Sequence, residues 1–172
     1  MSLGARRYLV AAADPVAHAL LAAAVAAPLG RRAMLTAVVA GTAIDVDHVV
    51  ATRSLRPTAM LTMAARPRSH ALLVTGVAAT AGALAGGPVH GWAAFAGLGS
   101  HLLRDASDAG APTPLLWPWR PARQIPRRWA AAGIAGLALG SWLLSRRGAG
   151  GAGRPSPAAA GGGGGTAPPR TA

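Results

Sequence analysis

The chain has 172 residues, of which 52% are hydrophobic and only 13% are charged, about half of the charged share of an average globular domain. This composition excludes an ordinary water-soluble domain and predicts an all-α protein that spans a membrane. The formal net charge of +12 comes from arginines in short clusters between apolar runs, which is typical of the flanks of membrane helices. A nucleic-acid partner is not expected, because it would need a basic face on a soluble module.

The first predicted helix begins at the Asp-Pro pair of residues 14–15, since an N-cap carboxylate and a proline at the first helical position form a helix-start signature. We expect this helix to cover residues 15–29, with His18 in its first turn. A second apolar run, residues 33–44, is short for a membrane span, which needs about 20 helical residues. It ends in the sequence Asp-Val-Asp-His at residues 45–48.

A basic loop follows over residues 52–69, with an interfacial turn expected near residues 60–63. The next uncharged stretch, residues 71–103, is long enough for two helices. The Gly-Gly-Pro sequence at residues 86–88 is a turn signal, so this stretch predicts a tight helical hairpin.

A proline-rich loop covers residues 104–128, and its tryptophans suit a membrane interface. A last uncharged helix is predicted over residues 129–145. Beyond it the chain is rich in Gly, Ala and Pro and cannot bury enough apolar surface to become ordered. We therefore predict a helical membrane domain of four to five helices, residues 1–147, and a disordered tail, residues 148–172.

The arginines also predict an orientation in the membrane. With five spanning helices, eleven of the 17 arginines lie on the same side as the N-terminus and six lie on the other side. The positive-inside rule assigns the arginine-rich side to the cytoplasm. The predicted location is the plasma (inner) membrane, with several crossings.

Histidine and aspartate are the most informative residues of the chain. In the five-helix topology all of them except His90 fall near cytoplasmic helix ends, at Asp14, His18, Asp45, Asp47, His48, His70, His101, Asp105 and Asp108. An uncompensated carboxylate at membrane depth costs about 2.5 to 3.5 kcal/mol. Such a group of residues therefore indicates a functional site.

The spacing of these residues predicts a metal site. His101 and Asp105 are four residues apart, which places both on one face of a helix and lets them bind the same cation. Asp45 and His48, three residues apart, can do the same. The predicted ligands are His18, Asp45, His48, His70, His101 and Asp105. Since the chain has no cysteine, histidine and carboxylate ligands suit a divalent metal, zinc first and manganese or iron as alternatives.

Some of these residues have simpler interpretations. Asp14 is expected to be only an N-cap, Asp108 a turn residue, and His90 an interfacial residue beside the helix turn. The arginines next to the motifs are interpreted as positive-inside flanks, in preference to anchors for a phosphate group. These arginines are Arg66, Arg68 and Arg104.

The motifs resemble those of a known family. They read Asp-Pro-Val-Ala-His ending at His18, Asp-Val-Asp-His ending at His48, Arg-Ser-His ending at His70, Ser-His-Leu-Leu-Arg-Asp ending at Asp105, and Leu-Leu-Trp-Pro ending at Pro118. In order and spacing they resemble the YdjM-type family of LexA-binding, inner-membrane-associated, metal-dependent hydrolases. More distantly, the His-x-x-x-Asp pair is similar to that of zinc-dependent phospholipases C. The resemblance implies a membrane-bound hydrolase and points to phosphoester chemistry.

Two positions depart from the family pattern. Ile44 replaces a proline, which is a tolerable change of the backbone, whereas Ala65 stands where the third motif has its first histidine. Ser69 replaces a threonine and keeps the hydroxyl group. Loss of the histidine is compatible with loss of a second metal, a changed substrate or a non-catalytic member.

The leading prediction is a membrane-bound metal-dependent hydrolase that acts on a phosphoester or lipid-like substrate at the cytoplasmic face. Asp47 is the predicted general base, which activates a metal-bound water, although Asp45 could exchange roles with it. The alternative is a non-enzymatic membrane protein with a structural metal site, whose basic loops bind anionic lipid or, as the resemblance suggests, a regulator protein. A transporter ranks last, because the ionisable groups lie at helix ends and not near the midplane.

Overall fold

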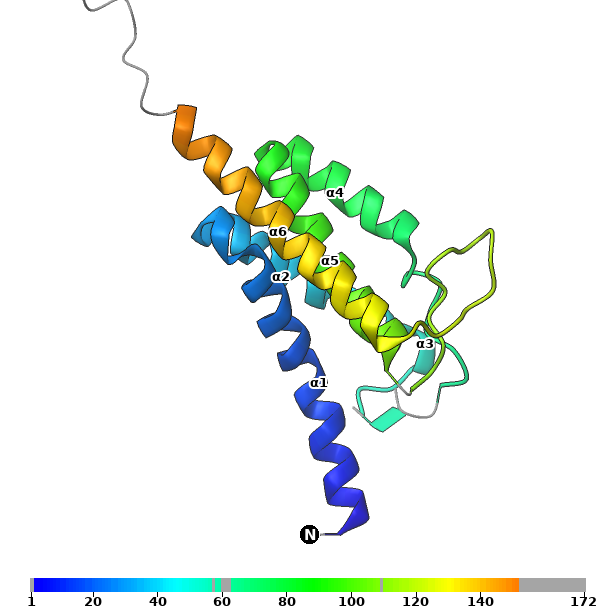
Figure 1. The fold of residues 1–172 in the computed structure, drawn as a ribbon. Helices are drawn as coiled ribbons and strands as arrows, with labels where there is room; N and C mark the ends of the chain where they lie inside the picture. The colour runs from blue at the N-terminus through cyan, green and yellow to red at the C-terminus, as the bar shows by residue number, and fades with distance from the viewer. Residues whose placement is uncertain (1, 57, 60–62, 109, 152–172) are drawn as a thin grey trace, which may run out of the picture.

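The computed structural model describes residues 2–56, 58–59, 63–108 and 110–151. Over these residues the fold is all-helical, with no β-strand and one isolated bridge between Thr113 and Arg123. The elements shown in Figure 1 are α1 (Leu3–Ala26), the short 3-10 helix η1 (Ala27–Leu29), α2 (Arg31–Ala43), α3 (Val46–Thr52), α4 (Leu72–Gly86), α5 (Pro88–Ser107) and α6 (Arg127–Gly151). The prediction of an all-α bundle is confirmed, since five of these helices match the five expected ones and α3 continues α2 after a turn.

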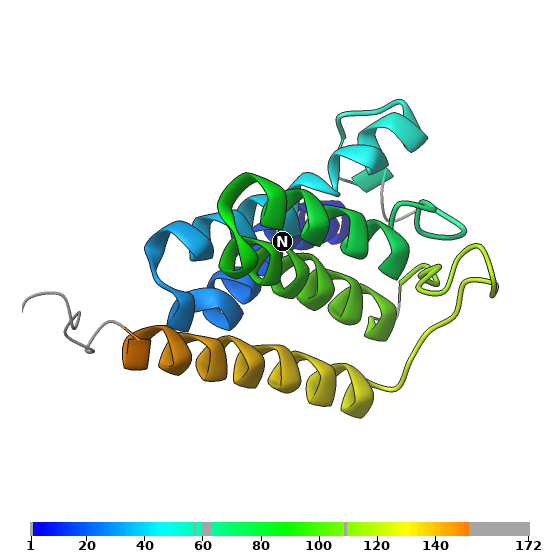
Figure 2. The same cartoon turned by 90° about the horizontal axis from the view of Figure 1, so that it is seen from above.

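Helix α5 is the centre of the bundle. It packs against α1, α2, α4 and α6, and Figure 2 shows it between α4 and α6. Twelve of its 20 residues are buried, most of them Ala, Gly or other small residues. The indole Nε1 of Trp92 donates a hydrogen bond to Ser141 Oγ (2.9 Å) and ties α5 to α6.

Small residues let α2 and α5 approach until their backbones touch. A Cβ atom at Gly97 would collide with the carbonyl group of Ala37, and a Cβ at Gly41 would lie 2.9 Å from the carbonyl oxygen of Gly97. Contacts of this kind are typical of helices that pack inside membranes. The close approach also brings the backbone carbonyl of Gly41 next to the last turns of α5.

The predicted start of the first helix is wrong. Helix α1 begins at Leu3, where Ser2 is the N-cap and its Oγ accepts a hydrogen bond from the backbone N–H of Ala5 (3.2 Å). Pro15 therefore lies inside the helix, and His18 is near its middle and not in its first turn.

The reason lies in what Asp14 contacts. Its carboxylate is 2.6 Å from Nη1 of Arg104 on α5, so it forms an ion pair and does not cap a helix. The residues before it are rich in alanine, the strongest helix former, so α1 continues through Pro15 at the cost of one backbone hydrogen bond. A contact between two helices thus overrides a local signature.

The other predicted helix boundaries agree more closely with the structure. The turn between α4 and α5 falls at Gly87, whose φ of +83° needs glycine, and the predicted hairpin is confirmed. Helix α6 runs on to Gly151, so the first residues of the predicted tail are helical. The rest of that tail, and most of the turn expected near residues 60–63, lie outside the described residues.

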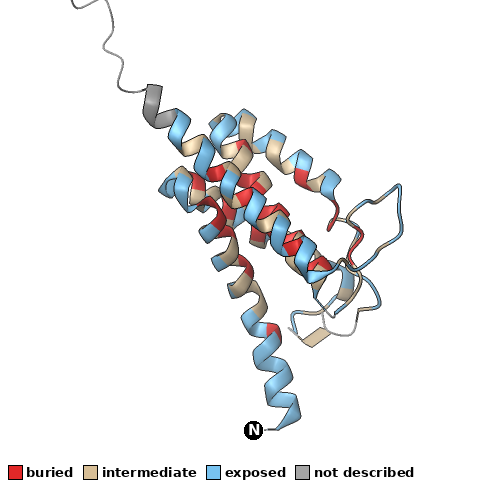
Figure 3. Cartoon of the chain, in the orientation of Figure 1, coloured by how far each residue is buried: buried red, intermediate tan, exposed pale blue. Residues whose placement is uncertain are grey.

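The outer surfaces of the helices are strongly apolar. Two segments, Leu3–Leu29 and Arg31–Thr52, are long and apolar enough to cross a membrane, and only 28% and 22% of their most apolar windows are buried. Figure 3 shows the exposed residues along the first half of α1 and the outer faces of α2, α4 and α6. Two segments able to enter a membrane by length and composition are therefore found among the described residues, while the four to five crossings stay a prediction.

Candidate metal centre

The structure brings the predicted ligands and the predicted base together at one end of the bundle. We call the set the His/Asp cluster: His18 of α1, Asp45 and the α3 residues Asp47 and His48, His70 just before α4, and His101 and Asp105 near the end of α5. In Figure 1, α3 and the C-terminal end of α5 lie together at this end. The four imidazoles are at most 1% exposed.

Asp105 is the centre of the cluster. Its Oδ1 lies 3.2 Å from His18 Nε2, and its Oδ2 lies 3.3 Å from His101 Nε2 and 3.5 Å from His70 Nε2. The rings of His18 and His101 are stacked, with 3.7 Å between their centroids. One carboxylate, 2% exposed, therefore meets three imidazole nitrogens from three different parts of the chain.

A backbone contact orients His101. Its Nδ1 lies 2.7 Å from the carbonyl oxygen of Gly41. A carbonyl oxygen can only accept, so Nδ1 carries the hydrogen and the lone pair of a neutral ring is on Nε2, facing Asp105. Metal-binding histidines are commonly held by such a contact on their other nitrogen.

The position of His70 favours a cation in the cluster. Its Nε2 lies 3.3 Å from Nε2 of His101, and its Nδ1 lies 3.3 Å from Oδ2 of Asp47. Burial lowers the pKa of His70, against the raising effect of Asp47, which favours a neutral ring with one hydrogen. If Nδ1 carries the hydrogen, the lone pair on Nε2 faces the lone pair of His101 Nε2. If Nε2 carries it, the lone pair on Nδ1 faces the carboxylate of Asp47. A positive ion among these atoms would remove the repulsion.

Asp45 and Asp47 complete the set of donors. Asp45 Oδ1 lies 3.5 Å from His101 Nε2, and Asp47 Oδ1 lies 3.1 Å from His48 Nδ1. Three groups offer three ligand atoms within 4.8 Å of one another: His18, His101 and Asp105; Asp45, His70 and His101; and Asp47, His48 and His70. All six predicted ligands belong to at least one of these groups.

The cluster also contains buried polar atoms without a hydrogen bond. They are His18 Nδ1, Asp45 Oδ2, both carboxylate oxygens of Asp47, His48 Nδ1, His70 Nδ1 and Asp105 Oδ2. Leaving a buried polar group unpaired costs about 1–3 kcal/mol, and more for a charged one. Such a concentration of buried nitrogen and oxygen atoms, most of them in ion-pair contacts but without a hydrogen bond, fits a divalent metal, and the donor types suit zinc, manganese or iron.

Two arginines that the sequence interpretation assigned to membrane flanks contact the cluster. Arg66 lies 3.3 Å from Asp105 Oδ1 and 3.1 Å from His48 Nε2. Arg104 lies 2.7 Å from His18 Nε2 and pairs with Asp14. The guanidinium of Arg68, in contrast, lies over the ring of Trp117 at 5.9 Å from its centroid.

The remaining candidates are placed elsewhere or in other roles. His90 Nδ1 is 2.8 Å from Thr36 Oγ1, at the start of α5 and away from the cluster, which agrees with its structural interpretation. Asp14, predicted to be only an N-cap, belongs to the rim of the cluster, with Oδ2 3.4 Å from His18 Nε2. The spacing of four between Asp14 and His18 is the sequence signal that could have identified it. Ala65, where the family pattern has a histidine, is exposed.

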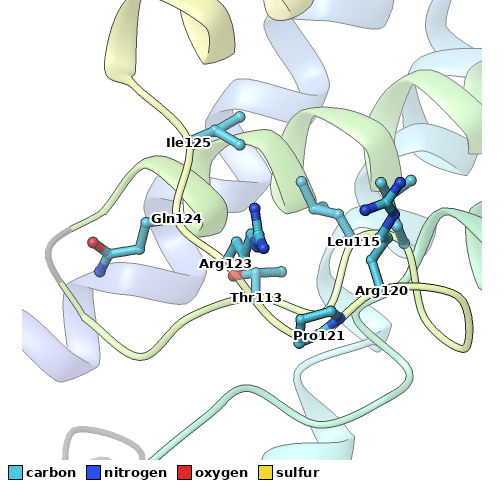
Figure 4. A pocket seen from close by; sticks show the side chains of 8 residues that line it. Thr113, Leu115, Arg120, Pro121, Arg123, Gln124 and Ile125 are labelled. Carbon is cyan, nitrogen blue, oxygen red and sulfur yellow. The ribbon is translucent and has the colours of Figure 1, made fainter.

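A separate cavity of 310 Å³ lies in the proline-rich loop (Figure 4). It is lined by Thr113, Leu115, Leu116, Arg120, Pro121, Arg123, Gln124 and Ile125 and holds no member of the cluster. The loop is nevertheless joined to the cluster's surroundings, because Arg66 N–H donates to Pro112 and Ile125 N–H donates to Ala106.

No family model matches the chain, and no curated protein or solved structure matches it. The resemblance to the YdjM-type family therefore stays a prediction made from the motifs. Any function assigned to the chain depends on the residues of the cluster and on their geometry.

Proposed function

We propose that the chain is a membrane-bound metal-dependent hydrolase acting on a phosphoester or lipid-like substrate. The observation that supports this most directly is the convergence of four buried imidazoles and three carboxylates from separate parts of the chain. Ionisable side chains are seldom buried beside apolar helices unless they serve a function. Seven of their buried nitrogen and oxygen atoms make no hydrogen bond, which structural packing alone does not explain.

The group formed by His18, His101 and Asp105 is the best candidate for holding the metal, because all three side chains are buried and His101 is oriented by Gly41. Asp45, His48 and His70 supply further ligands. A bound zinc ion in an open site would lower the pKa of a coordinated water to about 7. The same ligands could hold manganese or iron.

Asp47 is proposed as the general base. Its side chain is 24% exposed, although both carboxylate oxygens are buried, so the cluster lies directly beneath the surface at this residue. The Asp14–Arg104 pair, with side chains 31% and 34% exposed, marks a second point where the cluster approaches the surface. Access of this kind favours a catalytic site, which needs a position for water and substrate.

The proposed location is the inner membrane, with several crossings and the cluster on the cytoplasmic side. This topology is supported by two helical segments that are long enough to span a membrane. It is also supported by the larger number of arginines on the N-terminal side. A substrate drawn from the bilayer would reach the cluster without crossing water. The neighbouring cavity combines two arginines with apolar side chains, which suits an amphiphile.

A structural metal site is the second candidate, and the nearly complete burial of the four imidazoles favours it. In that case the basic loops would bind anionic lipid or a regulator protein. A structural site is closed by four protein ligands, whereas a catalytic site keeps one position for water. Metal coordination by four protein atoms, with no water ligand, would support this alternative.

The first test is metal analysis of the detergent-purified protein beside His101→Ala. We expect the wild type to hold metal in stoichiometric amount and the variant to lose it. His90→Ala is the matched control, because this histidine contacts Thr36 outside the cluster. A wild-type protein without metal, even after reconstitution with zinc or manganese, would contradict the hydrolase proposal.

A further inference from the structure

Arg104 forms a hydrogen bond with a nitrogen of His18 that a metal would need as a ligand. Its Nη1 lies 2.7 Å from His18 Nε2 and 2.6 Å from Asp14 Oδ1. A guanidinium group can only donate and does not lose its proton in proteins, so the lone pair of His18 Nε2 accepts from Arg104. The same nitrogen faces Asp105 Oδ1 at 3.2 Å, and its residue belongs to the group His18, His101 and Asp105.

Arg66 likewise contacts cluster atoms that a metal would need, and one of them is the Asp105 oxygen that His18 also faces. Its Nη1 lies 3.1 Å from His48 Nε2, and its Nη2 lies 3.3 Å from Asp105 Oδ1. The side chain is only 11% exposed, and its Nε is buried without a hydrogen-bond partner. A buried arginine with an unused donor is poorly explained as a membrane flank, since flanking arginines point their charge into water.

The two arginines compensate the negative charge of the cluster, and they compete with a metal for it. A metal bound to His18 Nε2 needs the lone pair that accepts from Arg104, and a metal bound to Asp105 Oδ1 competes with Arg66. A bound metal therefore frees N–H groups of both arginines. His18 and Asp105 link the two guanidinium groups through successive contacts, so the donors of both arginines belong to the surroundings of one candidate ligand group.

We propose that a bound metal displaces Arg66 and Arg104 from the cluster. Without metal, the two arginines stabilise the cluster through their ion pairs and hydrogen bonds. With metal bound, they bind the phosphate group of the substrate. The inference rests on the proposed function and narrows its substrate class to phosphate esters. Phosphate fits because guanidinium groups bind it through paired N–H donors, and its several oxygens can meet two arginines and a metal at once. Anion binding then requires a loaded site.

The first arm of the test measures zinc affinity. Arg66→Ala and Arg104→Ala are compared with the wild type and with Arg68→Ala, an arginine that lies over Trp117 and is the matched control. We expect each of the first two variants to bind zinc at least about tenfold more tightly, since a competing charged hydrogen bond is gone. If zinc affinity is unchanged or weaker in both Arg66→Ala and Arg104→Ala, the proposed competition between arginine and metal is wrong.

The second arm measures binding of inorganic phosphate by calorimetry, with the protein loaded with zinc and free zinc removed. We expect Arg66→Ala and Arg104→Ala to weaken phosphate binding at least about tenfold, and the zinc-free wild type to bind it no better than these variants. Phosphate affinity that is unchanged in both variants would overturn the proposal, whatever their zinc affinity. Arg66→Gln and Arg104→Gln replace any alanine variant whose thermal unfolding shows that it does not fold.

The third arm identifies the source of the phosphate. A water-soluble phosphomonoester and a short-chain phosphatidic acid are tested for displacement of bound phosphate in the same detergent. If either compound displaces the bound phosphate, the inference is supported, and the compound that does so shows whether the source is a soluble ester or a lipid headgroup. If neither compound displaces it, the inference is wrong. If the wild type binds no metal at all, the proposed function itself has failed, whereas zinc binding with unaffected phosphate binding rejects only the role of the arginines.

Discussion

Asp47 has the most exposed side chain of the cluster, at 24%, and it contacts two imidazoles, His48 at 3.1 Å and His70 at 3.3 Å. Asp47→Asn keeps the shape of the side chain but removes its ability to take up a proton. We expect turnover of a phosphoester substrate to fall about 10²- to 10⁴-fold with metal content unchanged. Measured turnover together with metal analysis checks this prediction.

The same variant distinguishes three roles for this carboxylate. Loss of turnover with metal retained identifies a base, and unchanged turnover removes Asp47 from that role. Loss of both identifies a ligand, or a group that orients His70 through its Nδ1. Asp108→Asn is a suitable control, since this aspartate ends α5 and belongs to none of the ligand groups.

At the scale of the elements, the contact between α2 and α5 determines the geometry of the cluster. A Cβ at Gly97 would collide with the Ala37 carbonyl group, so Gly97→Ala must push the helices apart and lengthen the His101–Gly41 hydrogen bond. We expect zinc affinity to fall about 10- to 100-fold and the free energy of unfolding to fall by about 1–3 kcal/mol. Zinc titration and thermal unfolding in detergent measure both effects.

Gly136→Ala is the matched control for this substitution. Gly136 lies on α6, and a Cβ atom added there would meet no neighbouring atom within 4 Å, so alanine at this position should be neutral or slightly stabilising. If Gly97→Ala behaves like Gly136→Ala in both measurements, the close contact of α2 with α5 does not control the site.

At the scale of the whole molecule, the arginine distribution predicts which side of the membrane holds the cluster. The chain has no cysteine, so single cysteines can be introduced at Ala64, close to Arg66, and at Ala85, at the far end of α4. Helix α4 has 15 residues and is therefore about 22 Å long, which separates the two positions. We expect a membrane-impermeant maleimide to label Ala85→Cys on intact cells, and Ala64→Cys only after lysis.

The opposite labelling pattern would place the cluster on the side of the membrane that faces away from the cytoplasm. Recovery of the chain in the soluble fraction without detergent would contradict membrane insertion altogether. The first result would remove the cytoplasmic location from the proposed function and the second would remove the membrane. Neither would change the geometry of the His/Asp cluster, because that geometry depends on contacts within the bundle.

Local patterns in the sequence were sufficient to predict most helices and the residue types of the His/Asp cluster. The α4–α5 hairpin follows from a Gly-Gly-Pro signal, and the pairing of His101 with Asp105 follows from a spacing of four residues on a helix. Both properties depend on neighbouring residues only. The same reasoning misplaced the start of α1, because the ion pair of Asp14 with Arg104 joins residues on two different helices.

By itself the sequence determined an apolar, all-helical chain in which histidine and aspartate are the available metal ligands, since composition and periodicity decide these properties locally. Only the tertiary structure decided that the motifs meet at Asp105, that Gly41 orients His101, and that Arg66 and Arg104 belong to the site. Apart from that of Arg66, which lies in the loop before α4, these contacts depend on how closely α1, α2 and α5 pack. That distance is determined by small residues on facing helices, and one residue pattern in a single helix cannot specify it.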